Sequence, residues 1–179
     1  MALSDTQREE LLERVSMKAG DYEEISISCA QGTLVALLEE FDLQCTEDMV
    51  GAMSFMPGMA SRDETCGALV AGLTVLGMVN GRSKLSDPSY NTPEGKADFF
   101  KSRERAYRFC EEFKKEMGST MCGDIRRKLF GRTYNTFIPE EFEQLVADGA
   151  KKKCRVPPEA AARIAASIIL EVQEEGDKA

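Results

Sequence analysis

The cysteines are the residues of this 179-residue chain that could carry unusual chemistry, because the sequence has six of them and no histidine. Without histidine, a Ser-His-Asp triad, a Cys-His nucleophile and His-ligated zinc or haem are all excluded. No CxxC pair occurs either, so zinc-finger spacing, thioredoxin-type spacing and a CxxCH haem-attachment site are absent. Any site chemistry must therefore bring together cysteines that are far apart in the sequence.

Two cysteines lie next to patterns that are typical of helix starts. Cys29 follows the first residue of SCAQ (residues 28–31), which fits a Ser-x-x-Gln capping box and places Cys29 in the first helical turn. SRDE (residues 61–64) fits Ser-x-x-Glu, so we expect a helix to start at Ser61 with Cys66 as its fifth residue.

Two more cysteines lie close to predicted helix starts. Ser119 is predicted to cap the helix that contains Cys122, and Cys154 stands three residues before Pro157, a typical first-turn residue. At a helix N-terminus, unpaired N–H groups and the helix dipole stabilise a thiolate. We therefore expect these four cysteines to have a lowered pKa and raised reactivity or metal affinity.

The other two cysteines are predicted to be structural. Cys110 falls on the apolar stripe of a long predicted helix, together with Phe99, Ala106, Phe113 and Met117, which favours inert packing. Cys45 precedes Thr46, a plausible helix cap, but nothing connects it to the other four cysteines.

Helical periodicity runs through most of the chain, and no convincing two-residue alternation indicates a strand. We predict a compact all-α bundle of about seven or eight helices in a single domain. It would comprise an N-terminal helix in residues 1–25, a cysteine-containing redox domain in 26–175 and a solvated tail in 176–179. Residues 80–93 are rich in turn formers and form the one long predicted loop. The predicted helices cover residues 5–18, 28–41, 46–55, 62–79, 94–117, 120–130, 139–152 and 157–175.

One predicted helix carries an unusual face of small residues, made by Gly67, Ala68, Ala71, Gly72 and Gly77. Each glycine costs roughly 1 kcal/mol relative to alanine inside a helix, so the face needs a reason. Tight helix packing is favoured over contact with a ligand. The same face would admit a second copy of the chain, so a homodimer is the oligomer that the sequence allows.

Charge and hydropathy restrict the partners and the compartment. The formal charge of −8 and the lack of a basic cluster argue against nucleic-acid binding, since phosphate contacts need cations. The longest nearly unbroken apolar run, residues 67–79, is shorter than the roughly 20 residues of a spanning helix. With no signal-type N-terminus, we expect no membrane insertion and a cytoplasmic location, where thiols stay reduced unless they cycle or bind metal.

The segments around the four cysteines are similar to a known family. SCAQ (28–31), ETCGALVAGLTVLG (64–77), MGSTMC (117–122) and Cys154 before an Ala/Ile-rich helix resemble the motifs of the bacterial C-GCAxxG-C-C redox-active proteins. That module also looks related to the cluster-bearing part of split-Soret cytochrome c. The resemblance implies that Cys29, Cys66, Cys122 and Cys154 form one redox constellation.

Two redox mechanisms fit that constellation. In the first, the four cysteines ligate an iron–sulfur cluster such as [2Fe–2S], or another metal, for electron transfer or redox sensing. Backbone N–H groups at Gly67 and Ala68 would then donate to sulfur. Haem is not expected.

In the second mechanism, no cofactor is needed. Cys66 attacks a disulfide, and Cys29 or Cys122 resolves the mixed disulfide that forms. An unidentified redox protein would serve as partner in either mechanism. A third alternative is a non-redox helical accessory or interaction module whose cysteines only pack.

Among the other clusters, RRK (residues 126–128) is the best candidate for binding an anion. Because it lies on a predicted helix surface, a solvated face is the favoured interpretation.

Overall fold

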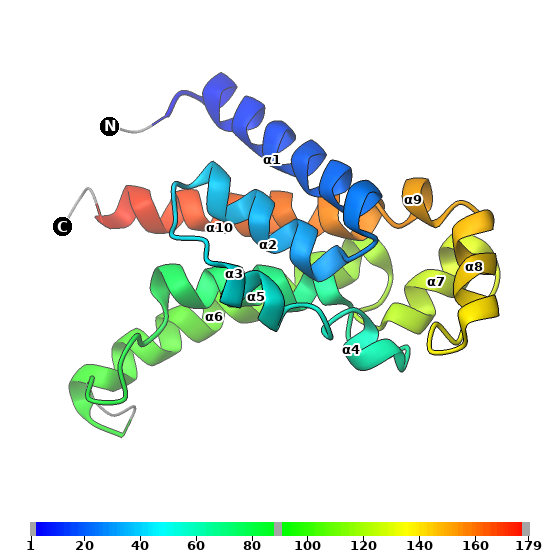
Figure 1. The fold of residues 1–179 in the computed structure, drawn as a ribbon. Helices are drawn as coiled ribbons and strands as arrows, with labels where there is room; N and C mark the ends of the chain where they lie inside the picture. Colours follow the sequence, from blue (N-terminus) through cyan, green and yellow to red (C-terminus); the bar gives the residue numbers. More distant parts are fainter. Residues whose placement is uncertain (1–2, 88–90, 177–179) are drawn as a thin grey trace.

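Five long helices form a bundle that makes up most of the molecule (Figure 1). The computed structural model describes residues 3–87 and 91–176. The bundle contains α1 (Asp5–Ser26), α2 (Cys29–Glu40), α5 (Gly67–Asn80), α6 (Pro93–Met117) and α10 (Val156–Gly176). Helix α10 packs against the other four, so the C-terminal segment completes the core of the bundle.

Side-chain caps mark the starts of α1 and α6. At α1, Ser4 and Gln7 form a reciprocal capping box, with Gln7 N donating to Ser4 Oγ at 3.3 Å and Ser4 N to Gln7 Oε1 at 3.0 Å. At α6, Thr92 Oγ1 accepts from Gly95 N at 3.2 Å, and Pro93 occupies the first helical position.

The core of the bundle combines small residues with large ones. Helix α10 buries five alanines between Ala160 and Ala166 beside Ile168 and Ile169, which lets neighbouring helices approach closely. On α5, a Cβ added to Gly72 would lie 2.3 Å from the Phe109 ring of α6. At Gly72, the predicted small-residue face therefore serves tight helix packing.

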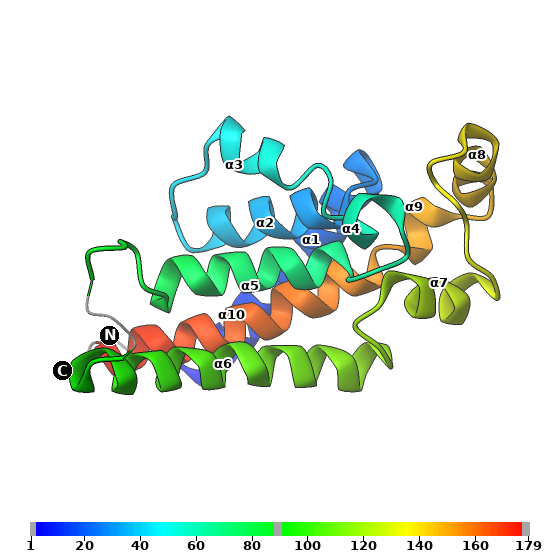
Figure 2. The ribbon, with the colours of Figure 1, turned by 90° about the horizontal axis from the view of Figure 1, so that it is seen from below.

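Short helices gather at one end of the bundle. These are α4 (Gly58–Ser61), α7 (Cys122–Phe130), α8 (Pro139–Ala147) and α9 (Ala150–Lys153), and Figure 2 shows them away from the start of α1 and the end of α10. Helix α3 (Glu47–Ala52) lies beside α2. A small second core at this end contains Tyr134, Leu145 and Ala150.

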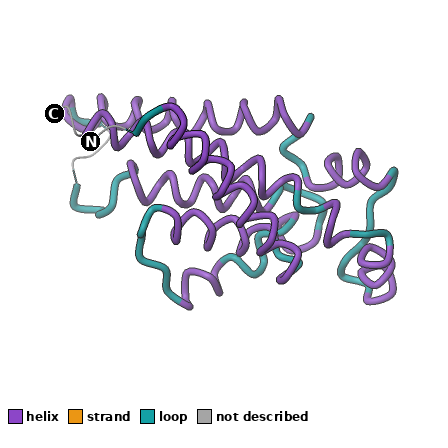
Figure 3. Tube along the Cα trace, turned by 90° about the horizontal axis from the view of Figure 1, so that it is seen from above, coloured by secondary structure: helices purple, strands orange, loops and turns teal. Residues whose placement is uncertain are grey.

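The all-α single-domain prediction is confirmed. Figure 3 shows helices and loops only, and residues 3–87 and 91–176 contain no named strand. Within the same residues, no helix is both long and apolar enough to cross a membrane. The predicted tail at 176–179 lies outside the described residues except for Gly176, which ends α10.

Three predicted boundaries were wrong. Helix α1 continues to Ser26 rather than ending at 18, and Ile27 then reverses the chain in a left-handed conformation (φ 51°). The helix predicted over 62–79 begins only at Gly67. The helix predicted over 139–152 is interrupted near Gly149, whose φ of 93° is incompatible with a continuous α-helix.

Candidate functional site

Cys66 and Cys122 are held side by side by two short paired segments, residues 63–66 and 120–123. Cys66 N donates to the Thr120 carbonyl at 2.9 Å, and Cys122 N donates to the Glu64 carbonyl at 2.6 Å. These bonds flank an isolated antiparallel bridge between the two segments. Because Cys66 is the N-cap of α5 and Cys122 is the first residue of α7, the pairing brings two helix starts together.

The chain before Cys66 follows an unusual path. Met59, Ala60, Ser61 and Asp63 all have positive φ, between 39° and 65°, which is uncommon for residues other than glycine. The predicted capping box at residues 61–64 is therefore wrong. The backbone must reach the extended pairing with residues 120–123 before a helix can start.

Cys29 begins α2, as predicted, but its sulfur is held by α5. The Ala68 N–H donates to it, and a Cβ added to Gly67 would lie 2.8 Å from Cys29 Sγ. Position 67 therefore requires glycine because a sulfur lies against it. The side chain of Cys66 lies close enough to raise the pKa of the Cys29 thiol.

The capping box predicted at residues 28–31 is not formed. Ser28 is the N-cap of α2 but its side chain makes no capping bond, and Gln31 Nε2 instead donates to the Val50 carbonyl at 3.0 Å. Gln31 thereby connects α2 to α3. Ser28 Oγ is left buried without a hydrogen-bond partner among the described residues.

Cys154 lies in the connection between α9 and α10, the approach to the last helix that the sequence predicted. It packs against the small second core. The next residue, Arg155, pairs with Asp21 at 2.8 Å and with Glu24 at 2.7 Å, both on α1. These ion pairs fix the start of α10, and with it Cys154, against the end of α1.

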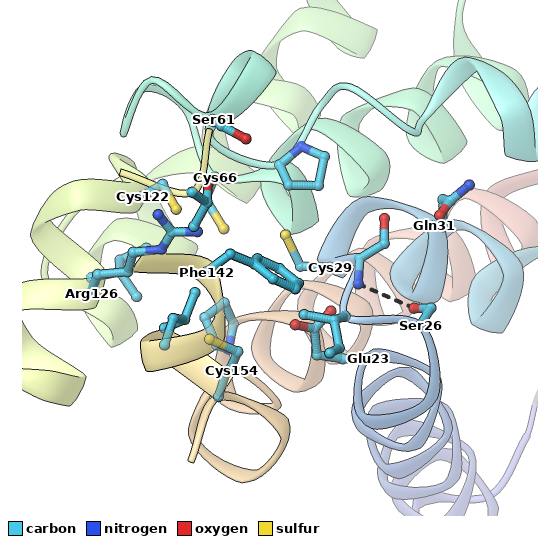
Figure 4. A pocket seen from close by; sticks show the side chains of 18 of the residues that line it. Glu23, Ser26, Cys29, Gln31, Ser61, Cys66, Cys122, Arg126, Phe142 and Cys154 are labelled. Carbon is cyan, nitrogen blue, oxygen red and sulfur yellow. Dashed lines mark hydrogen bonds between the residues drawn. The ribbon is translucent and has the colours of Figure 1, made fainter. Parts of the chain in front are cut away.

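All four predicted cysteines line one partly enclosed cavity of about 350 Å³ at the short-helix end (Figure 4). Cys66 is 3% exposed, and the other three are partly buried. In Figure 4 the Phe142 ring of α8 is seen between Cys154 and the other three sulfurs. The structure therefore brings together cysteines that the chain separates by as many as 125 positions, from 29 to 154.

The prediction that these thiols have a lowered pKa was wrong for three of them. Hydrogen bonding to Cys66 and burial raise the pKa of Cys29 well above its ordinary value. Burial raises the pKa of Cys122 and of Cys154 to about 12, although Arg126 opposes the shift. Desolvation outweighs the stabilisation that a helix N-terminus supplies, so these thiols are protonated at neutral pH.

One charged residue of the cavity, Glu23, was missed by sequence reasoning, and Arg126 was singled out only as part of the basic run at residues 126–128. Glu23 of α1 is 4% exposed, and burial raises the pKa of its carboxyl to about 8. Arg126 of α7 faces the same cavity, but its guanidinium donates to Asp63 Oδ1 at 3.1 Å and to the Tyr134 carbonyl at 3.2 Å. The signal for Glu23 was its fourth-residue spacing from Ala19 and Val15, both fully buried on α1.

The predicted basic run does not form an open anion site. Besides the bonds of Arg126, Arg127 donates to Asp124 at 2.7 Å and Lys128 donates to the Met117 carbonyl at 3.1 Å. All three cations of this run are therefore engaged in hydrogen bonds within the protein.

The cavity residues do not form a ready metal site. No group of three or more Cys, Asp or Glu side chains in the described part of the chain is arranged to hold a metal ion. The roles predicted for Cys29, Cys66, Cys122 and Cys154 as ligands, and for Gly67 and Ala68 toward a cofactor, stay predictions. What the structure does show is the Ala68 N–H directed at a cysteine sulfur.

The remaining two cysteines lie outside the cavity. Cys110 is partly buried and packs against the main core, and burial raises the pKa of its thiol. Cys45 is exposed just before α3, whose N-cap Thr46 accepts from Met49 N at 3.3 Å. Neither Cys45 nor Cys110 is among the residues that line the cavity.

Comparison with known proteins identifies the family. Residues 27–168 match the family model described as "Putative redox-active protein (C_GCAxxG_C_C)", so the chain belongs to that family. The match spans all four cysteines of the cavity. No curated protein and no solved structure matches the chain.

Proposed function

We propose that this member of the redox-active C_GCAxxG_C_C family exchanges electrons through reversible disulfide formation between Cys29 and Cys66. The observation that carries the proposal is that the Cys29 sulfur lies against Gly67, the residue that follows Cys66, on the cavity wall. Disulfide formation needs sulfurs that approach within bonding distance with little movement of the backbone. The Cys29 sulfur already lies against the backbone next to Cys66.

The chemistry is a two-electron exchange with an external disulfide. Cys66 attacks the disulfide and releases one thiolate, which leaves a mixed disulfide on Cys66. Cys29 then attacks Cys66 Sγ, the external bond breaks, and the second thiolate leaves. The protein has lost two thiol protons and two electrons, and the external disulfide has become two thiols.

A low-molecular-weight disulfide suits this site as the oxidant. Cys66 is only 3% exposed and faces the cavity, so an attacking geometry requires a molecule that enters it. The cavity of about 350 Å³ admits a small molecule but not a folded partner.

The raised pKa values set a condition on this reaction. The thiolate is the nucleophile in thiol–disulfide exchange, and the Cys29 thiol is held protonated by its hydrogen bond to Cys66 and by burial. Reaction at neutral pH therefore requires that the proton of Cys29 be removed as the S–S bond forms.

An iron–sulfur centre is the second candidate, and the observation that favours it is the gathering of four cysteines around one cavity. Bound iron would supply the positive charge that buried thiolates need. Its test is the iron and acid-labile sulfide content of anaerobically prepared protein with its ultraviolet–visible spectrum. Protein that stays colourless after reconstitution with iron and sulfide would remove this candidate.

Disulfide mapping tests the dithiol proposal. Reduced protein is equilibrated with a mixture of reduced and oxidised glutathione, free thiols are blocked, and the peptides are identified by mass spectrometry. We expect one Cys29–Cys66 disulfide and a mass loss of about 2 Da. Cys29→Ser and Cys66→Ser should each abolish it, and Cys110→Ser, the matched control, should retain it.

Two results would contradict the dithiol proposal. One is a protein whose six cysteines all stay reduced or glutathionylated. The other is a set of scrambled disulfides in which the Cys29–Cys66 pair has no preference.

A further inference from the structure

One oxygen of a buried carboxyl in the cysteine cavity has no hydrogen-bond partner among the described residues. Glu23 lies near the C-terminal end of α1, its residue is 4% exposed, and its Oε2 is among the buried polar atoms left unpaired in the described part of the chain. Leaving a carboxyl in this state costs free energy, so such a residue calls for a functional explanation.

The position of Glu23 is imposed by close packing between α1 and α2. A Cβ added to Gly32 of α2 would lie 3.0 Å from the Glu23 backbone nitrogen, so a larger residue would require the two helices to shift apart. Ile27 N also donates to the Glu23 carbonyl at 2.8 Å in the turn that leads to Cys29. The carboxyl is therefore held beside the start of α2.

Four titratable or charged groups face Glu23 from the surrounding elements. They are Cys29 on α2, Cys122 and Arg126 on α7, and Cys154 before α10. Arg126 is engaged with Asp63 and a backbone carbonyl, and it has no ion pair with Glu23. Figure 4 shows the Glu23 carboxyl directed into the cavity on the side of Cys29.

We propose that Glu23 accepts the thiol proton of Cys29 when Cys29 attacks the mixed disulfide on Cys66. This inference rests on the proposed function. The step is balanced. The Cys29 S–H bond breaks, its proton passes to the Glu23 carboxylate, the Cys29–Cys66 bond forms, and the external thiolate leaves. During reduction by external thiols the proton returns from Glu23 to Cys29.

The acidity of Glu23 suits this role. Burial raises the pKa of its carboxyl to about 8, with Arg126 opposing the shift. A general base is most effective when its pKa lies near the working pH, because it can then both take and return a proton. A surface glutamate with an ordinary pKa would be a much weaker acceptor for a thiol proton.

The test measures two steps separately: formation of the mixed disulfide on Cys66 and its resolution by Cys29. Protein in a Cys45→Ser background is mixed with 2-hydroxyethyl disulfide. The mixed disulfide and the intramolecular disulfide are then followed by acid quenching and mass spectrometry across pH 6–10. The variants are Glu23→Gln, Glu23→Asp and, as a control, Glu13→Gln, which removes an exposed carboxyl from the same helix outside the cavity.

We expect Glu23→Gln to slow the resolving step by at least about tenfold at pH 8, with the first step unchanged. The resolving rate of the wild type should rise through an inflection near the pKa of Glu23, and this inflection should be lost in Glu23→Gln. Glu23→Asp should restore part of the rate and the inflection. Glu13→Gln should behave as the wild type.

A Glu23 that acts only through its charge would give the opposite result. The Glu23 charge also raises the pKa of Cys29, Cys122 and Cys154, so a purely electrostatic Glu23 would make Glu23→Gln resolve faster. A faster or unchanged rate would overturn the inference while the Cys29–Cys66 disulfide still forms. If that disulfide is absent from the wild type, the proposed function itself fails.

If Glu23→Gln does not fold, the wild-type profile and Glu23→Asp decide the question. A wild-type resolving rate without an inflection near pH 8 would then overturn the inference, and an inflection that shifts in Glu23→Asp would support it.

Discussion

The bundle and the cavity end follow different physical rules. In the bundle, long helices bury large apolar side chains completely, as at Leu34, Phe109 and Ile169. At the cavity end, helices are short, and several residues between 58 and 63 adopt positive φ. Polar atoms of Glu23 and Ser28 are buried there without partners among the described residues, although the bundle also buries such atoms at Thr33, Asn80 and Arg108.

This difference indicates that the well-packed bundle offsets the free-energy cost of the less favourable structure at the cavity end. Strained backbone persists only where the surrounding structure holds it in place, and it is enriched at functional sites. The start of α5 is where the two regions meet, since Cys66 faces the cavity and the following turns enter the core. Variants of the two regions should therefore separate stability from redox chemistry.

The largest expected effect on stability comes from the bundle. Phe109→Ala removes a fully buried ring that lies against Gly72, so it should lower the free energy of unfolding by about 3–5 kcal/mol. Chemical denaturation measures the loss. Protein that remains folded should still form the Cys29–Cys66 disulfide, and failure to do so would contradict the separation of the two regions.

The next effect is a pH dependence that originates in the cavity. The pKa of Glu23 rises from an ordinary 4.5 to about 8 in the folded state. Between these values the folded state binds more protons than the unfolded state. The free energy of unfolding should therefore fall, by on the order of a few kcal/mol, as pH rises from about 4.5 to 8.

Glu23→Gln tests this origin, because it should flatten the pH dependence of unfolding over that range. Denaturation curves at several pH values measure it. A variant as pH-dependent as the wild type would show that another group is responsible. The thiols of Cys122 and Cys154 should add a separate loss of stability above pH 9.

A smaller effect is expected where the two regions meet. In Gly67→Ala, the new Cβ would lie 2.8 Å from Cys29 Sγ and 3.0 Å from Pro57 Cα, so the sulfur must move. Overpacking of this kind costs about 1–3 kcal/mol. Disulfide formation should slow as well, and an unchanged rate measured by quenched alkylation would show that the contact is dispensable.

The smallest expected effect is a gain in stability. Gly77 lies in the same helix, but a Cβ added there meets nothing within 4 Å. Gly77→Ala should raise the free energy of unfolding by about 0.5–1 kcal/mol, because alanine is the better helix former. Thermal or chemical denaturation measures the gain, and a loss would mean that this face is covered in solution.

The bundle was largely predictable from the sequence because its signals are local and repeated. Apolar periodicity predicted each of the long helices, although α1 extends beyond its predicted end and α5 starts later than predicted. The prediction failed where long-range pairing decides the backbone. Nothing in residues 61–64 shows that residues 120–123 will pair with residues 63–66 and delay the helix to Gly67.

The four cysteines were found through their positions near helix starts and through the family resemblance. Their acidity was not predictable, since desolvation of Cys122 and Cys154 depends on how α8 and α9 enclose the cavity. Glu23 was missed for the same reason. One charged residue on an amphipathic helix usually faces solvent, and only the packing of α1 on α2 shows that this one does not.

A redox titration of the reduced protein tests the central claim most directly. The protein is equilibrated with glutathione buffers of increasing oxidised fraction under anaerobic conditions, and the Cys29–Cys66 disulfide is quantified by quenched alkylation and peptide mapping. We predict one two-electron transition, with a tenfold change in the ratio of disulfide to dithiol for about 30 mV. Cys29 and Cys66 thiols that stay free across the whole range would contradict the account.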